Sequence, residues 1–401
     1  MIQGTATLVI DLGNSSTKCT VLFGKDGTGK YKERRFDLPN IFSGIDSDYV
    51  VAADYNDRTS FIIRADVDYE NMHLEGNYCC GELQEKEKPL STIKPSASQQ
   101  KYNLESSLLS YRLAFMQAMR ELMWQNHISD VTQMDITWKV ITLLPPGDLD
   151  IGKDKISAIV KNIDHIDSVY PNLYFDVKIQ SVCVLPEGYC AYAGVVFDKG
   201  HTYRQAYKCL TEENVLVFDV GAGTTDCLLI RNNKLVQNSK YTCTQGGNNV
   251  YHQVRRILRA RGIDLNDEDI KQGILVGHVK VGSQRTSIVD VVNQAKANVA
   301  AAILSEIQDF FTAADIKIQS IGYVLVCGGG SMANSECEDI MTLGEKIIER
   351  INQLSEHTLL IELPTHMVTK ETEDGDVQKI EEQISPRDLN LVGASILAEI
   401  L

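Results

Sequence analysis

Long apolar segments and an export signal are both missing from this sequence of 401 residues. No apolar run reaches the ~18 residues that a helix needs to cross a bilayer. The opening MIQGTATLVID has neither the basic region nor the cleavage site of a signal peptide. The sequence therefore predicts a cytoplasmic protein that is not embedded in a membrane.

Metal-spaced cysteines and histidines are missing as well. The ten cysteines include no C-x-x-C pair, and the eight histidines form no cluster with ligand spacing. Most cysteines lie in apolar, strand-like stretches such as YVLVCGGG, so we expect reduced, buried thiols rather than a disulfide framework. The adjacent Cys79 and Cys80 lie in such a stretch too, which favours packing over redox chemistry.

Positive charge is in deficit. The chain has 39 Lys and Arg against 54 Asp and Glu, a net charge of −15. Neutralising nucleic-acid phosphates requires clustered basic side chains, so we expect no direct contact with nucleic acid. Any such contact would run through a basic partner. Hydrophobic and charged fractions of 43% and 23% are typical of a folded soluble protein.

One acidic, glycine-bearing segment occurs twice. LVIDLGNSSTKCTVL begins at Leu8 and LVFDVGAGTTDCLLI at Leu216, a constant offset of 208 residues. Each copy alternates apolar and polar residues on both sides of its turn, which predicts strand–turn–strand. A single copy at such a long period indicates two related domains rather than a solenoid.

The remaining pattern predicts alternating strands and helices. Strands are expected at 49–54, 60–67, 76–84, 135–145, 173–186 and 323–327, and helices at 104–126, 290–314 and after the glycine pair of QGGNNV. Polar composition predicts exposed loops at 85–103 and, in the acidic KETEDGDVQKIEEQISP, at 369–385.

The two glycine turns have the composition of a phosphate clamp. A tight turn between strands exposes successive N–H groups, and small residues at its tip let a phosphate approach. The first turn offers Gly13, Asn14, Ser15 and Ser16, with Lys18 as a nearby cation, and the second offers Gly221, Ala222, Gly223, Thr224 and Thr225. One such turn is better explained by an ordinary hairpin, but two matched copies favour phosphate binding.

A carboxylate precedes each turn. Asp11 and Asp219 would repel a polyphosphate unless a divalent cation lay between them, and hydrated Mg²⁺ suits that arrangement. The duplication is explained if two domains close on one nucleotide. There is no G-x-x-x-x-G-K-[ST] motif, and each turn leads into a strand rather than a helix.

In these motifs the sequence resembles the actin-like ATPase superfamily. DLGNSSTK resembles its first phosphate motif, VFDVGAGTTD the second, LPEGYCAYAG the connecting motif, and QGGNNV the glycine pair near ribose and phosphates. YVLVCGGGSMAN resembles the adenosine motif, and RDLNLVGASILAEIL the closing helix. GNYCCGELQ and ITLLPPGDL further resemble the plasmid-segregation branch, the ParM-like and archaeal actin-like proteins.

The resemblance implies a fold and a division of the chain. It implies duplicated α/β domains of the ribonuclease-H-like type, with mixed sheets flanked by helices and a nucleotide cleft between the domains. Domain I would span 1–185, with a small subdomain at about 36–100 and completion by a C-terminal helix at 386–401. Domain II would span 186–385, with a small subdomain at about 250–300.

The resemblance also implies roles for individual residues. Glu187 would orient the attacking water, and Asp11 and Asp219 would hold Mg²⁺. The nucleotide would be ATP, with GTP left open, and its adenosine and phosphates would lie on Gly246, Gly247, Gly328, Gly329, Gly330 and Met332. The sequence departs from the chaperone and kinase branches at Asn248 and Asn249, and Asn14 replaces a small residue in the first turn.

Two classes of function remain open at this point. The leading hypothesis is a filament-forming ATPase that segregates plasmid or phage DNA through a basic adaptor, with self-contacts from 86–103 and 369–385. The alternative is a small-molecule kinase of the same superfamily, although no distinctive sugar-binding motif is present. About 70 residues follow the adenosine motif, which is too little chain for a chaperone's peptide-binding domain. A cell-shape filament of the MreB type would usually bring an amphipathic membrane segment, and MIQGTATL is too short and polar for one.

Overall fold

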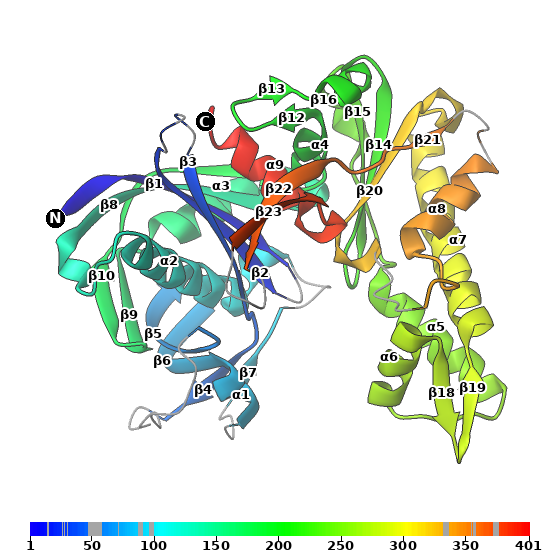
Figure 1. Cartoon of the computed structure of the whole chain (residues 1–401), viewed down its shortest axis with the longest axis horizontal. Coiled ribbons are helices and arrows are strands. Elements are labelled where there is room, and N and C mark those ends of the chain that lie inside the picture. The colour runs from blue at the N-terminus through cyan, green and yellow to red at the C-terminus, as the bar shows by residue number, and fades with distance from the viewer. Residues whose placement is uncertain are drawn as a thin grey trace. The chain divides into compact units, whose positions relative to one another are not determined.

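The computed structural model divides into two compact units (Figure 1). Unit 1 contains 1–186, 199–201 and 394–401, and unit 2 contains 187–198 and 202–393. The residues described are 1–13, 16–25, 27, 29, 31–46, 58–70, 72–86, 91–95, 100–331, 337–353, 355, 358–371 and 377–401.

The first sheet of unit 1 is built around the N-terminal strand. β1 (Ile2–Leu12) pairs antiparallel with β2 (Thr17–Lys25) and parallel with β8 (Met134–Leu144). β3 (Tyr31–Leu38) and β11 (Lys178–Pro186) complete the order β11-β8-β1-β2-β3. The C-terminal halves of β1 and β8 (8–12 and 140–144) are buried on both faces, which explains their largely apolar sequences LVIDL and VITLL.

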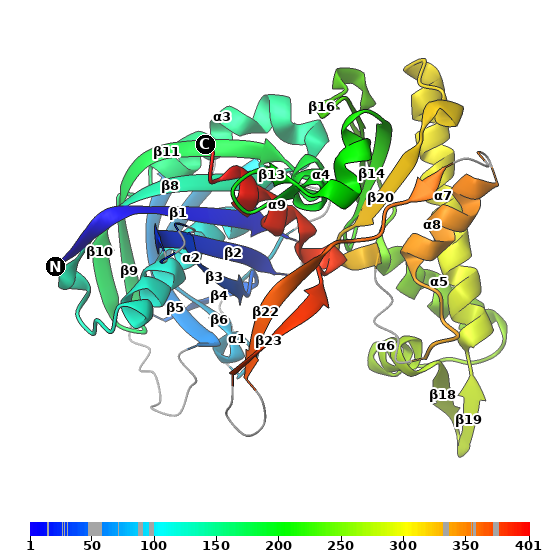
Figure 2. The same ribbon diagram turned by 45° about the horizontal axis from the view of Figure 1, so that its top comes forward.

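A second sheet in unit 1 has the strand order β10-β9-β5-β6-β4-β7. Its strands are β4 (Phe42–Ile45), β5 (Ser60–Tyr69), β6 (Met72–Gly81), β7 (Ser91–Ile93), β9 (His165–Tyr170) and β10 (Leu173–Asp176). Helix α2 (Glu105–Gln125) contacts strands of both sheets and lies between them (Figures 1 and 2). Phe115 of α2 packs edge-on against Trp138 of β8, with ring centroids 5.6 Å apart. The short α1 (Glu82–Lys86) follows β6, and the amphipathic α3 (Leu149–Lys161) packs on β11.

Unit 2 repeats the strand arrangement of the first sheet. β14 (Asn214–Val220) pairs antiparallel with β15 (Thr225–Arg231) and parallel with β20 (Tyr323–Cys327). The sheet order is β16-β15-β14-β20-β21, with β17 paired to β15. These last strands are β16 (Lys234–Leu235), β17 (Tyr241–Cys243) and β21 (Leu359–Leu360). The same hairpin with the same parallel neighbour therefore occurs in both units, as the repeat predicts.

Helices and three hairpins complete unit 2. The helices are α4 (Tyr189–Val196), α5 (Gly247–Ala260), α6 (Asp267–Val276), α7 (Val289–Ala313) and α8 (Leu343–Asn352), and α9 (Leu389–Leu397) continues into unit 1. The hairpins are β12–β13 (Phe197–Asp198 with Thr202–Tyr203, whose turn belongs to unit 1), β18–β19 (His278–Val281 with Gln284–Ser287) and β22–β23 (Thr365–Glu371 with Val377–Gln383).

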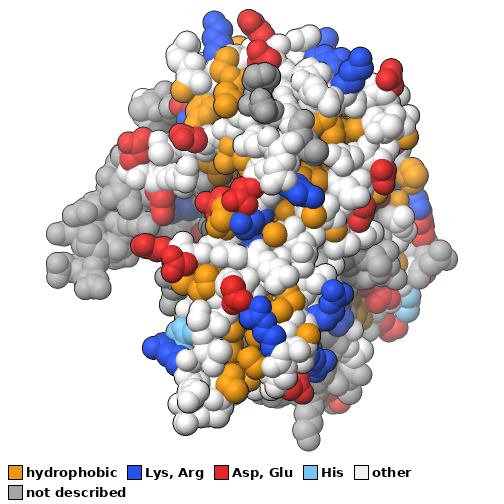
Figure 3. All heavy atoms as spheres, turned by 90° about the vertical axis from the view of Figure 1, so that its right-hand side faces the viewer, with side chains coloured by type: hydrophobic (Ala, Val, Ile, Leu, Met, Phe, Trp, Pro, Cys, Tyr) orange, Lys and Arg blue, Asp and Glu red, His pale blue; other side chains and the backbone are white. Residues whose placement is uncertain are grey.

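Acidic and basic side chains are interspersed on the face shown in Figure 3. No helix among the described residues is long and apolar enough to span a membrane.

Most predicted elements are confirmed, with two corrections. The expected acidic loop at 369–385 is wrong for its described part, because seven residue pairs from Thr365↔Gln383 to Glu371↔Val377 form the β22–β23 ladder. Cross-strand pairing overrides the polar composition there. The strand expected at 76–84 ends at Gly81, and α1 begins at the next residue, Glu82. Most of the strand expected at 49–54 lies outside the described residues, as does part of the loop at 85–103. The predicted domain boundaries stay predictions.

Candidate functional site: two glycine turns

The first glycine turn joins β1 to β2. Asp11 lies opposite Lys18 in the strand register. The Gly13 amide donates to the carbonyls of Asp11 and Ser16, both at 3.1 Å. A Cβ at Gly13 would lie 2.7 Å from the Ser16 carbonyl oxygen, so this position requires glycine. The predicted phosphate contacts Asn14 and Ser15 lie outside the described residues.

Asp11 and Lys18 form an ion pair at the base of this turn. The Lys18 Nζ lies 2.6 Å from Asp11 Oδ2, and the two side chains are only 11% and 6% exposed. The amine expected to meet phosphate oxygens is therefore held on the carboxylate of its own hairpin. Breaking a buried ion pair is costly because it leaves a charge away from water.

Asn40, just after β3, supports the same turn from outside the motif. Its Nδ2 donates to the Gly13 carbonyl, and the residue is buried. Its Oδ1 is buried without a hydrogen-bond partner among the described residues. The sequence contained no signal for Asn40.

The second turn, in unit 2, closes with the same geometry. The Gly221 amide donates to the Thr224 carbonyl at 2.8 Å, and Asp219 lies opposite Asp226. The carboxylate of Asp226 accepts from the Thr242 hydroxyl of β17. Where the first turn places a lysine opposite its aspartate, the second places another carboxylate.

Three glycine motifs pack backbone to backbone around the second turn. The Gly247 amide donates to the Gly221 carbonyl at 3.0 Å, and the Asn248 amide donates to the Ala222 carbonyl at 2.7 Å. A Cβ at Gly246 would lie 2.8 Å from that Gly221 oxygen, and one at Gly330 would collide with it. Gly246 of QGGNNV and Gly330 of the predicted adenosine motif are thus needed for close approach of main chain to main chain.

Glu187 follows β11 and precedes α4. It is 8% exposed, which is unusual for a glutamate. The next residue, Gly188, has φ +71°, and a Cβ there would lie 2.8 Å from a Leu228 methyl group. The glycine thus lets the chain turn sharply from the strand into the helix, fixing where Glu187 leaves the sheet.

Glu187 and Gly188 form a corner between β11 and α4, called the Glu187 corner below. Asn390 of α9 connects this corner to the second turn. Its Oδ1 accepts from the amides of Gly188 at 2.8 Å and Ala191 at 3.1 Å, and its Nδ2 donates to Asp219 Oδ2. The residue lies in the predicted closing helix, but nothing in the spacing singled it out. It is the main site residue that the sequence reading missed.

The segment beyond the adenosine motif is held by α7. Asn293 donates to the Asp339 carbonyl at 2.9 Å and accepts from the Met341 amide at 3.0 Å. The buried Lys296 donates to the Met341 carbonyl at 2.7 Å. Burial lowers the pKa of this amine to about 8, although Glu345 acts in the opposite direction. Met332 lies outside the described residues.

The cysteines that match in the repeat are inert packing groups. Burial raises the pKa values of the Cys19 and Cys227 thiols well above the usual range. The ten cysteines all lie in the described part of the chain and form no disulfide there, and Cys79 and Cys80 are buried. Thiols with raised pKa values are poor nucleophiles, so the packing prediction for these positions is supported.

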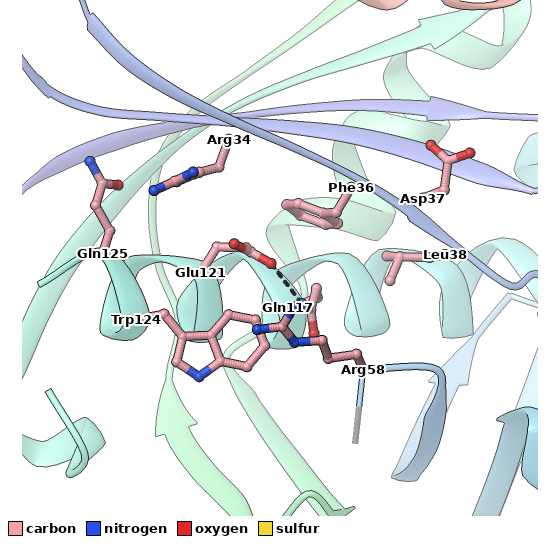
Figure 4. A pocket seen from close by; sticks show the side chains of 9 residues that line it. All are labelled: Arg34, Phe36, Asp37, Leu38, Arg58, Gln117, Glu121, Trp124 and Gln125. Atoms are coloured by element: carbon pink, nitrogen blue, oxygen red, sulfur yellow. Dashed lines mark hydrogen bonds between the residues drawn. The ribbon is translucent and has the colours of Figure 1, made fainter. Parts of the chain in front are cut away.

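A separate pocket in unit 1 contains none of the predicted site residues. It has a volume of about 410 Å³ and is lined by β3, by the end of α2 and by Arg58 (Figure 4). The Arg58 guanidinium lies 5.2 Å from the centre of the Trp124 ring, and Gln117 donates to Glu121 at 2.9 Å. The lining includes two arginines and two carboxylates: Arg34, Phe36, Asp37, Leu38, Arg58, Gln117, Glu121, Trp124 and Gln125. A polyphosphate would need an excess of positive charge that this pocket does not have.

The predicted site residues thus fall into two groups. Unit 1 brings together Asp11, Gly13, Ser16 and Lys18. Asn390 joins the Glu187 corner to Asp219 in unit 2. The other described site residues also lie in unit 2: Glu187, Asp219, Gly221, Ala222, Gly223, Thr224, Thr225, Gly246, Gly247, Gly328, Gly329 and Gly330.

Known structures of the same architecture cover nearly the whole chain. The actin-like protein Alp7A covers 100% of this chain and 97% of its own, at 15% identity and TM-score 0.64. The archaeal actin homologue Ta0583 covers 98% and 99%, at 14% identity and TM-score 0.63. A ParM from a Clostridium botulinum filament covers 99% of both chains, at 17% identity and TM-score 0.59. No curated protein sequence matches the chain.

The chain is thus a protein with the actin-like fold. Residues 217–336 match the model of the C-terminal domain of archaeal MreB-like actin homologues. That match begins within β14 and takes in the second glycine turn, the glycine pair and the adenosine motif. The resemblance to actin-like proteins inferred from the motifs is confirmed.

Proposed function

We propose that this protein is an ATPase that assembles into filaments and moves plasmid or phage DNA through an adaptor. The observation that carries the proposal is the duplicated hairpin, in which a buried carboxylate leads a glycine turn in each unit of an actin-like fold. Two such turns suit one polyphosphate with a divalent cation. Solved structures of this fold include an archaeal actin homologue with ADP and a Bacillus thuringiensis ParM with AMPPNP.

The residues present fit Mg²⁺ and the phosphates. The carboxylates of Asp11 and Asp219 are the hard oxygen donors that Mg²⁺ prefers, and it would keep part of its water shell. The close packing of Gly246 and Gly330 on Gly221 leaves main chain, not side chain, beside the second turn. Bound Mg²⁺ would neutralise charge on the phosphate oxygens.

Glu187 is the proposed water-positioning residue. Hydrolysis of a γ-phosphate depends on orienting a water and stabilising charge rather than on covalent chemistry. The carboxylate of Glu187 would accept a hydrogen bond from that water, and Gly188 fixes the chain direction at this point. Lys18 would meet phosphate oxygens by leaving, or by sharing, its ion pair with Asp11.

Filament assembly is the proposed use of the nucleotide. A relative of this fold comes from a 15-stranded ParM filament. ATP would favour the assembling state and hydrolysis would loosen it. The net charge of −15 suits recruitment of a basic, DNA-bound adaptor by electrostatic attraction. ATP rather than GTP is proposed as the nucleotide.

Light scattering followed by pelleting tests the assembly. The purified protein with Mg²⁺ and ATP is expected to scatter and to sediment, whereas the protein with Mg²⁺ and ADP is not. A flat trace from protein that still binds ATP would reject the filament and favour the small-molecule kinase. A screen of phosphate acceptors would then follow.

Replacing Glu187 tests the chemistry separately. Glu187→Ala is expected to keep ATP binding and assembly while lowering phosphate release by about 100-fold or more, since a positioned base contributes about that much. Glu212→Ala removes an exposed carboxylate from the same unit and is the matched control. Phosphate release from the Glu187 variant at the parent rate would remove Glu187 from the mechanism.

A further inference from the structure

We infer that Asn390 is a positioning residue that orients the metal-binding carboxylate of Asp219 and holds it in register with the Glu187 corner. This inference rests on the proposed function, because it assigns Asn390 a role in the same site. Its side chain makes three hydrogen bonds, to Asp219, Gly188 and Ala191, and is 6% exposed.

The polarity of the amide follows from its partners. Two backbone N–H groups point at one end of the Asn390 side chain, and an N–H can only donate, so that end must be the oxygen. The NH₂ end therefore faces Asp219 and donates to Oδ2. An asparagine supplies both roles at once, whereas aspartate lacks the donor and leucine lacks both.

Both oxygens of Asp219 are placed by this arrangement. Oδ2 accepts from Asn390, while Oδ1 lies so close to Gly328 that a Cβ there would collide with it. Gly328 has φ +87°, so glycine is favoured for its backbone as well. The hydrogen bond at Oδ2 and the close approach of the Gly328 backbone to Oδ1 restrict rotation of the carboxylate, and such preorganisation favours metal binding.

The donor to Asp219 is neutral, and this distinguishes it from the donor to Asp11. Lys18 brings a positive charge to Asp11 at 2.6 Å, which offsets the charge that attracts a cation. Asn390 fixes Asp219 without adding positive charge. An amide in this place orients the carboxylate and leaves its attraction for Mg²⁺ intact.

Asn390 also joins two steps of the proposed mechanism. Its Oδ1 accepts from the N-cap Gly188 and from the first turn of α4, and Gly188 directly follows Glu187. α9 approaches α4 closely, since a Cβ at Gly194 would lie 3.1 Å from the Gly393 nitrogen and one at Gly393 would collide with the Cys190 carbonyl. One side chain on this closely packed helix pair thus connects the proposed metal-binding carboxylate with the backbone next to Glu187.

The test compares Asn390→Asp with the parent protein. The variant keeps an acceptor for Gly188 and Ala191 but turns a carboxylate toward Asp219. The two carboxylates must then share a proton or turn apart, and either change takes Asp219 out of the state that holds Mg²⁺. We expect the Mg²⁺ concentration needed for half-maximal tightening of ATP binding to rise about tenfold or more. ATP binding in EDTA should change by less than about threefold, because the glycine packing is untouched. Asn232→Asp, an exposed change of the same charge in unit 2, is the control.

The polarity-swapped variant Asn390→Asp/Asp219→Asn completes the test. It restores one amide–carboxylate bond with its direction reversed, so thermal stability should return toward that of the parent while the Mg²⁺ dependence stays weakened. If Asn390→Asp does not fold, this variant carries the test, and its own failure to fold would overturn the hydrogen-bond assignment.

Two outcomes separate this inference from the proposed function. If the parent shows no Mg²⁺-dependent ATP binding, the proposed function fails first. If the parent shows it and Asn390→Asp has the same Mg²⁺ dependence, or the swapped variant regains the parent's, the role of Asn390 is overturned while the proposed function stands.

Discussion

The two glycine turns share a register and differ in how they are supported. In the first, Asp11 pairs with Lys18 of the next strand, and Asn40 donates to Gly13, so support comes from within about 30 residues. In the second, Asp219 receives its hydrogen bond from Asn390, which is 171 residues away in sequence. The glycine packing there also involves residues from the QGGNNV and adenosine motifs.

The two copies therefore share their backbone conformation and differ in the residues that stabilise it. A hairpin that carries its own cation can form its site locally. The second turn instead depends on contacts from three distant elements. The start of α5 and the glycines after β20 pack on its backbone, and Asn390 of α9 donates to Asp219. The second turn should therefore be more sensitive to distant substitutions, and the first to substitutions within its own hairpin.

The largest expected effect comes from blocking the distant support of the second turn. Gly330→Ala places a methyl group against the Gly221 carbonyl, and we expect it to destabilise unit 2 by about 4 kcal/mol and to weaken ATP binding. The neighbouring Gly329→Ala is the control, since its Cβ would meet only Arg387 at an ordinary 3.6 Å. Chemical denaturation measures both, and equal losses would contradict the packing argument.

Removing the local cation of the first turn is expected to have the next largest effect. Lys18→Met breaks the buried ion pair with Asp11 and should lower the unfolding free energy by about 3 kcal/mol. Asp226→Asn, at the matching position of the second turn, keeps an acceptor for Thr242 and should cost less than about 1 kcal/mol. The comparison between the turns would break if Asp226→Asn proved the more damaging change.

The smallest expected effect is a pH dependence belonging to unit 2. Burial lowers the pKa of Lys296 from the usual 10.5 to about 8, so between these values the unfolded chain binds more protons than the folded one. Stability should therefore rise with pH across that window, and the buried charge costs most below pH 8.

The gain is measured against Lys296→Met, which lacks the titrating amine. Relative to this variant, the parent should become more stable by about 1–2 kcal/mol between about pH 7.5 and about pH 9.5. Lys271→Met, at an exposed lysine of α6, should follow the parent's pH profile. If the difference in unfolding free energy between the parent and Lys296→Met did not change with pH, burial would not lower the pKa of Lys296 as expected.

The two glycine-turn hairpins, the helix at 105–125 and the long α7 could be predicted because their signals are local. Period-two alternation, helical spacing and glycine turns act over a few residues, and the repeat added the duplication. The acidic β22–β23 ladder was missed because its strands are stabilised by each other, and composition alone favoured a loop.

The sequence by itself determined two strand–turn–strand units, their glycines and the carboxylates that lead them. Only the tertiary structure decided that Asn390 donates to Asp219 and accepts from Gly188, and that Gly330 packs on Gly221. The physical reason is the range of the forces involved. Backbone preferences act between neighbours in sequence, whereas hydrogen bonds and van der Waals exclusion act between neighbours in space, wherever the folded chain brings them together.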